Sequence, residues 1–412
     1  MTASATPPGT TPRADPYRVT EIHHHARRSL LVAGLFAAAA PLTALLPHST
    51  GRWLPLHLFL VGGLLSAISG ATQLLAVTWS ASPAPPRRFT SAQRWILAVG
   101  ALAVALGREL DSTTSTAAGG VAVIVALVLL GVNLARIRST AVTRRFVPAI
   151  DTYLLAVLAG IAGAALAVAL VGGHTGARWS EVRAAHFTVS LYGLVGLTIA
   201  GTLPFFIATQ IRSKMSSRAT PRRVRILASW LGTATAVAAA AHVGGRPIVT
   251  AAALGAYSAG ILAMALLLPL PNRRQLRWAG PRLLQLGAGL GWWIAATLLL
   301  AASMAGEQAS HGPILLALVT GGFAQILVAS LAYFGPVLRG GGHHELTAGF
   351  ALTRSWVGLI AANTAALGAV TSRPAVLGVG LAVWIVDTAA RGALLARRAR
   401  RRGGPLVPSA ES

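Results

Sequence analysis

The chain has 412 residues, of which 54% are apolar and 11% charged, and its mean hydropathy is +0.64. A soluble domain carries about 25% charged residues, so most of this surface is expected to face lipid. The absence of cysteine excludes disulfides, thiolate metal sites, cysteine-held iron–sulfur clusters and cysteine nucleophiles. Any metal site must therefore use histidine or carboxylate ligands.

Residues 1–28 are rich in Pro, Thr and Ser and include His23, His24 and His25. They lack the apolar core and cleavage site of a signal peptide. We expect a disordered cytoplasmic tail with solvated histidines.

Residues 29–396 contain twelve apolar stretches, most of them long enough to cross about 30 Å of hydrocarbon as a helix. The third is the weakest, because Arg108 and Glu109 follow a short apolar run. The sequence predicts an all-α, polytopic membrane protein whose twelve-helix domain precedes a basic tail at 397–412. The expected spans are 29–47, 53–79, 94–108, 116–135, 147–172, 184–210, 226–243, 247–270, 283–305, 313–337, 349–370 and 374–396.

The 35 basic residues alternate strongly between the two sides of this topology. The tails and the loops after even-numbered spans, counted with the adjoining ends of the spans, hold 29 of them, and the other loops, counted in the same way, hold 6. Cytoplasmic loops of membrane proteins retain Lys and Arg, so we expect both termini to be cytoplasmic and the protein to lie in the plasma membrane. This placement explains the charge without nucleic-acid binding.

Spans two, six and ten share a pattern that suggests an internal repeat. Each begins near a histidine (His57, His186 or His311) and continues as a Gly-rich helix with hydroxyl or amide side chains. Because these spans are four apart, the chain can be divided into three groups of four helices.

Span two also carries a stripe of small and polar residues at three- and four-residue spacing, ending in Gln73. Span ten carries a similar stripe that ends in Gln325. Such a stripe faces protein. Two interpretations stay open at this point: close helix packing, or a slot for a cofactor or ion.

Four histidines are predicted to lie at one depth near the outer face: His57, His186, His242 and His311. Neutral imidazole is a common ligand for transition metals and haem. Glu307 precedes His311 by four residues and could orient its ring. Hydrogen-bonded structural roles are the alternative for each histidine, and solvated loop residues are the alternative for the Glu307–His311 pair.

Two acidic residues are expected in the inner half of the membrane. Asp387 and Arg391 are four apart on span twelve, which indicates an ion pair. Asp151 could pair with Arg144 or Arg145, or admit protons. No phosphate-binding loop, nucleophile elbow or HExxH motif occurs in the sequence.

The segments WLPLHLFLVGG, HFTVSLYGLVGLTIAGTLPFF and GGFAQILVASLAYFGPVLRGGG carry a resemblance to a known group of membrane proteins. With twelve spans and this histidine placement, the chain resembles subunit I of haem–copper oxidases and the related NnrS-type proteins. It is most similar to the multi-span domain found with copper nitrite reductases and multicopper oxidases of high-GC bacteria. The resemblance covers most of residues 25–400.

The resemblance implies that His57 and His311 bind a haem and that His186 and His242 bind copper. Gln73, Gln325 and Glu307, selected above by their spacing, are the expected supporting residues. The chain departs from the family pattern because span ten lacks a second histidine and His242 lacks an adjacent partner. A complete oxygen- or nitric-oxide-reducing centre is therefore not expected, and at most one haem or copper remains.

The expected function is that of a membrane protein of the haem–copper-like class in nitrite, nitric-oxide, copper or respiratory metabolism, with a cupredoxin-type redox partner. Whether it is an enzyme stays open, and a complete oxidase or reductase is not expected. The alternatives are a small-substrate transporter or permease and a non-catalytic scaffold.

Overall fold

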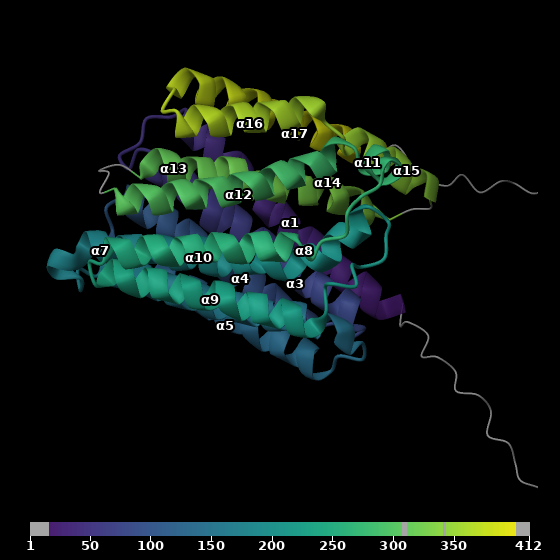
Figure 1. Cartoon of the computed structure of the whole chain (residues 1–412), viewed down its shortest axis with the longest axis horizontal. Coiled ribbons are helices and arrows are strands. Elements are labelled where there is room, and N and C mark those ends of the chain that lie inside the picture. Colours follow the sequence, from purple (N-terminus) through teal and green to yellow (C-terminus); the bar gives the residue numbers. More distant parts are fainter. Residues whose placement is uncertain (1–15, 307–310, 341–342, 401–412) are drawn as a thin grey trace, which may run out of the picture.

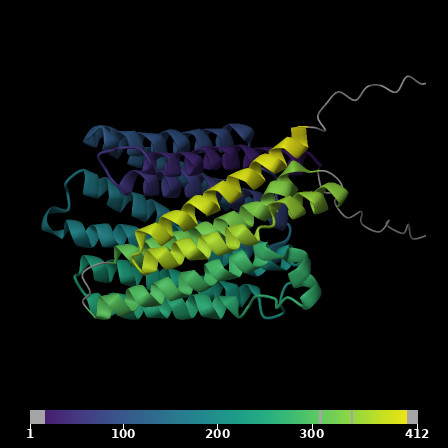
Figure 2. The same cartoon turned by 90° about the horizontal axis from the view of Figure 1, so that it is seen from above.

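The computed structural model describes residues 16–306, 311–340 and 343–400, and these residues form helices and connecting turns without any strand. Figures 1 and 2 show the long helices lying side by side in one bundle. In this described part of the chain, ten helical segments are long and apolar enough to cross a membrane, so the chain is a multi-span, all-α membrane protein.

Six of these segments are single helices, and a seventh is a helix preceded by one 3₁₀ turn, η2 (Arg144–Phe146). They are α4 (Arg87–Glu109), α5 (Thr113–Ser139), α6 (Val147–Val171), α9 (Pro221–Val243), α10 (Pro247–Ala265), α12 (Pro281–Ala305) and α17 (Pro374–Arg400). The third expected span, α4, is among them. The first and eleventh expected spans correspond to α1 (Pro16–Ala44) and α16 (Trp356–Val370), which lie outside this set. The helix α16 has 15 residues, which is short for a membrane span, and the first half of α1 is rich in charged side chains.

Spans two, six and ten are each interrupted by a π-helical segment. Span two consists of α2 (Trp53–His57), η1 (Leu58–Leu64) and α3 (Leu65–Ser80). Span six consists of the 3₁₀ turn η3 (Gly176–Arg178), α7 (Trp179–Thr188), η4 (Val189–Gly196) and α8 (Leu197–Gln210). Span ten consists of α13 (Gly312–Ala317), η5 (Leu318–Ala324) and α14 (Gln325–Arg339). Since π-helix is rare, its appearance in the three spans that share a sequence pattern supports the predicted repeat.

The helix packing also repeats three times. In each group of four, the π-helical segment packs against the first span of the group: η1 on α1, η4 on α6 and η5 on α12. The last two spans of each group pair closely as α4 with α5, α9 with α10, and α16 with α17. Figure 1 shows the pairs α9–α10 and α16–α17 as antiparallel neighbours.

Glycines of the π-helical segments make these contacts possible. A Cβ on Gly193 would lie 2.6 Å from the Cβ of Ala159 on α6, and a Cβ on Gly321 would lie 2.8 Å from Trp292 on α12. A Cβ on Gly62 would fall directly on the ring of Phe36 on α1. The small residues of the stripe on span two therefore serve close helix packing, which was one of its two interpretations.

The structure corrects the expected tail at 1–28, because residues 16–28 form the first turns of α1. Ile22 and His25 are buried, whereas His24 is exposed. Residues 1–15 lie outside the described residues. A further helix, α15 (His343–Thr353), begins in the loop expected after span ten and takes up the first residues of expected span eleven, 349–353. Ser355 then caps α16 by accepting a hydrogen bond from the Gly358 amide at 2.8 Å.

The bundle has two distinct ends. The short helices α7 and α13 lie at one end in Figure 1, and α11 (Arg273–Ala279) and α15 lie at the other. We call the first the histidine end, because His57, His186 and His311 stand near the starts of spans two, six and ten. We call the second the terminal end, because α1 begins there.

Candidate functional site at the histidine end

His57 and His186 share one local geometry. The Nδ1 atom of His57 lies 2.9 Å from the Trp53 carbonyl oxygen one turn earlier, and Nδ1 of His186 lies 2.8 Å from the Gly163 carbonyl oxygen on α6. A carbonyl oxygen only accepts hydrogen bonds, so Nδ1 is the protonated nitrogen in each neutral ring. Each Nε2 therefore keeps its lone pair. Metal-binding histidines typically donate one ring N–H to a carbonyl or carboxylate in this way, which orients the other nitrogen toward the metal.

The structure brings these two imidazoles together. His57 and His186 are close enough to interact electrostatically, and both are partly exposed. The ring of His57 stacks on Trp53 with a centroid distance of 3.7 Å, which fixes its plane. Two oriented imidazoles from spans two and six thus lie near each other at the histidine end.

A cation stands beside this pair. Arg183, one turn before His186 on α7, interacts electrostatically with both histidines. Its guanidinium lies over the rings of Trp179 and Phe187, 5.5 and 5.0 Å from their centroids. A positive neighbour repels a divalent metal ion more than a monovalent one, because the repulsion scales with charge.

His242 and His311 form the second pair, joined by an electrostatic interaction. Nδ1 of His311 lies 3.0 Å from the Ser303 hydroxyl, which donates its own proton to the Leu300 carbonyl at 2.8 Å. Ser303 therefore accepts from His311, whose Nε2 is also left unprotonated. Glu307, the expected orienting carboxylate, lies outside the described residues.

The four candidate histidines are therefore grouped as His57 with His186 and His242 with His311. No interaction joins His57 to His311 in the described part of the chain. In the same residues, no cluster of three or more His, Asp or Glu side chains could hold a metal ion. A metal at either pair would have coordination positions open for other ligands.

An apolar cavity of about 90 Å³ lies among spans two, six and ten. Its walls include Leu64, Leu75, Phe206 and Phe323, and no histidine or charged side chain lines it. Hydroxyls on the wall, such as that of Thr198, donate to carbonyls of their own helices. A cavity of this character stays dry. Among the described residues it offers no imidazole ligand for a haem, and a few hydroxyls are its only polar side chains.

Gln73 belongs to a polar cluster rather than to this cavity. Its amide nitrogen lies 3.1 Å from Nε2 of His25, and its amide oxygen accepts a hydrogen bond from Asn133 at 3.2 Å. Gln73 thereby lies against His25 of α1 and is hydrogen-bonded to α5. Gln325 is also fully buried, and its amide finds no hydrogen-bond partner among the described residues.

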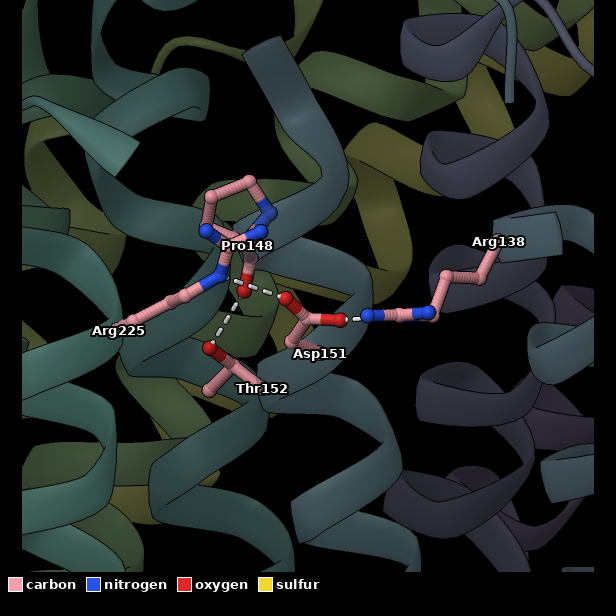
Figure 3. A network of polar contacts seen from close by, with 5 residues as sticks. All are labelled: Arg138, Pro148, Asp151, Thr152 and Arg225. Carbon is pink, nitrogen blue, oxygen red and sulfur yellow. Dashed lines mark hydrogen bonds and ion pairs between the residues drawn. The ribbon is translucent and has the colours of Figure 1, made fainter. Parts of the chain in front are cut away.

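The acidic residues that the sequence places in the inner half form ion pairs. Asp151 binds Arg138 at the end of α5 and Arg225 on α9, the latter at 2.8 Å (Figure 3). These partners replace Arg144 and Arg145, which the sequence had indicated. Asp387 and Arg391 form the predicted pair at 2.9 Å.

Sequence reasoning missed two buried arginines at the terminal end. Arg94 on α4 is 4% exposed and Arg282 on α12 is 1% exposed, yet neither has a carboxylate partner among the described residues. Both had been counted only as positive-inside charges. Their burial depends on which helices face each other, and the sequence does not give that arrangement.

Comparison with known proteins does not identify a function for this chain, so the geometry of the histidine pairs is the main guide to it. No family model matches the chain, and no curated protein matches it.

Proposed function

We propose that the protein binds one copper ion between His57 and His186 at the histidine end, and that it serves copper or nitrogen-oxide metabolism in the plasma membrane. The observation that carries this proposal is the shared geometry of the two rings. Each is oriented through Nδ1, and each keeps an unprotonated Nε2.

Copper(I) fits the pair better than other ions do. Imidazole suits copper, zinc, iron and nickel, but structural zinc takes four protein ligands, and only two are gathered here. The neighbouring cation Arg183 favours a monovalent ion. The open positions could accept a small ligand or exchange copper with a cupredoxin-type partner.

Haem fits less well. A haem ligated by His57 and His311 would need a flat slot between spans two and ten, and the cavity among these spans contains neither ring. The transporter alternative is also less well supported for a polar substrate, since that cavity has apolar walls. We therefore propose a copper ion held by two imidazoles, and neither a haem nor a transported polar substrate.

Copper binding to purified protein tests the proposal. Protein in mild detergent is incubated with Cu(I) under reducing conditions, desalted and analysed for metal content. We expect about one copper per chain, and a loss of most of it in His57→Ala and in His186→Ala. The exposed His174, in the loop between spans five and six, provides the control His174→Ala, which should bind copper normally.

The same variants distinguish the proposal from a haem site. A haem held as the family resemblance implies would give a Soret band that disappears in His57→Ala and His311→Ala but persists in His186→Ala. Wild-type copper content in both His57→Ala and His186→Ala would refute the copper site.

A further inference from the structure

A second polar site lies at the terminal end, between the start of α1 and the start of α4. A cavity of about 120 Å³ opens there, lined by Glu21, His24 and Arg28 from α1 and by Arg87, Ser91 and Arg94 from α4. A water-sized group needs about 10–15 Å³, so the cavity has room for an ion of several heavy atoms.

Arg94 lines this cavity, and no carboxylate pairs with it in the part of the chain that the structure describes. Its guanidinium donates to Nδ1 of His25 at 3.2 Å and to the Ser91 hydroxyl at 3.0 Å. Both partners are neutral, because a ring nitrogen that accepts a proton donor carries none itself. A buried cation without a counter-charge is costly, and an anion in the adjoining cavity would offset that cost.

The remaining charges around the cavity favour an anion too. Among the described residues, Glu21 is the one acidic side chain on its wall, and it pairs with Arg87 at 2.5 Å. Arg28 and Arg94 are then left as net positive charge. The cavity also adjoins the first turn of α4, whose cap residue Pro86 makes no side-chain hydrogen bond to the turn. The positive end of the helix dipole adds to the field.

We propose that this cavity binds a phosphate group, with Arg94 and Arg28 as its charged ligands and Ser91 as a hydroxyl donor. Guanidinium groups pair with phosphate through charge-assisted hydrogen bonds, which are among the strongest in proteins. Arg28 and Arg87 are exposed at the rim. A phospholipid headgroup or a free phosphate ion could supply the same chemistry.

Thermal unfolding of the full chain in detergent tests this site and separates the two sources. The midpoint is measured with short-chain phosphatidylglycerol, with a diacylglycerol of the same chains, and with inorganic phosphate at constant ionic strength. A ligand that binds only the folded state raises the midpoint. A rise with phosphatidylglycerol alone supports a lipid headgroup, and a rise with inorganic phosphate as well supports a free anion.

Variants assign the effect to the cavity. Arg94→Gln and Arg28→Gln should each weaken the phosphate-bearing ligand by about 10- to 100-fold, the loss expected for one charged hydrogen bond. Arg27→Gln is the matched control, because Arg27 is exposed, adjacent to Arg28 and absent from the cavity wall. Arg28 is also exposed, so its variant keeps the test valid if Arg94→Gln does not fold.

Two results would overturn the proposal. One is the absence of any rise with phosphatidylglycerol or phosphate beyond that seen with the diacylglycerol. The other is a rise that Arg27→Gln, Arg28→Gln and Arg94→Gln all retain in full.

Discussion

Arg282 illustrates how a single residue can work against the stability of this fold. Its side chain is 1% exposed, and none of its three guanidinium nitrogens has a hydrogen-bond partner among the described residues. The rings of Phe350 and Tyr333, with centroids 4.7 and 5.3 Å from its Cζ, provide cation–π attraction. Such attraction is worth about 2 kcal/mol when desolvated, which is less than the usual cost of burying a charge.

We expect Arg282→Met to stabilise the protein by about 1 kcal/mol, because it removes the buried charge and keeps an apolar side chain of similar length. The thermal midpoint in detergent should rise by a few degrees. Arg273→Met, at an exposed position of α11, should leave it unchanged. A lower midpoint for Arg282→Met would mean that the guanidinium stabilises the fold through an anionic partner.

At the scale of the helices, the π-helical segments bring each group's second span onto its first. Gly289 on α12 takes part in this contact, since a Cβ there would lie 2.7 Å from Ile326 and 3.0 Å from the Gly322 carbonyl oxygen. Gly291, two residues later on α12, faces open space. The two glycines therefore make a matched pair.

We expect Gly289→Ala and Gly321→Ala to destabilise the bundle by about 1–3 kcal/mol each, the usual cost of overpacking. Gly291→Ala should have no destabilising effect, because nothing opposes the added methyl group. Yield from membranes and the thermal midpoint of the purified variants measure this difference. Equal stability of all three variants would contradict the tight contact between spans nine and ten.

The helices themselves were largely predictable, because a run of apolar residues identifies a span without any knowledge of its neighbours. The repeat was visible in the spacing of His57, His186 and His311. The π-helical segments were not predicted, although the glycines that accompany them were noted. The burial of His25 was also missed, since it depends on Gln73 and Arg94, which lie 48 and 69 residues away.

The candidate site shows the same division between local and long-range information. Sequence spacing selected His57, His186, His242 and His311 as a group at one depth. It could not say which pairs meet, because that depends on how spans two, six, seven and ten are arranged around the bundle. The structure supplies the pairing, on which the proposal of a copper site at His57 and His186 rests.

At the scale of the whole molecule, the distribution of charge between the two ends bears on orientation. The sequence concentrates 29 of 35 basic residues in the segments on one side of the expected topology. This is the side of the chain termini, where Arg94 and Arg282 also lie. Because the positive-inside bias sets orientation, we propose that the terminal end is cytoplasmic and the histidine end faces out.

Cysteine labelling can test this orientation, because the chain contains no cysteine and the unmodified protein gives no labelling background. Ala177 is exposed at the histidine end, and Ser217 is exposed between α8 and α9 at the terminal end. A membrane-impermeant maleimide applied to intact cells should label Ala177→Cys, and should label Ser217→Cys only after the membrane is permeabilised. The reverse pattern would place the proposed phosphate-binding cavity outside the cell and the histidine pairs inside. The proposed copper site would then have to exchange its ion with a cytoplasmic partner.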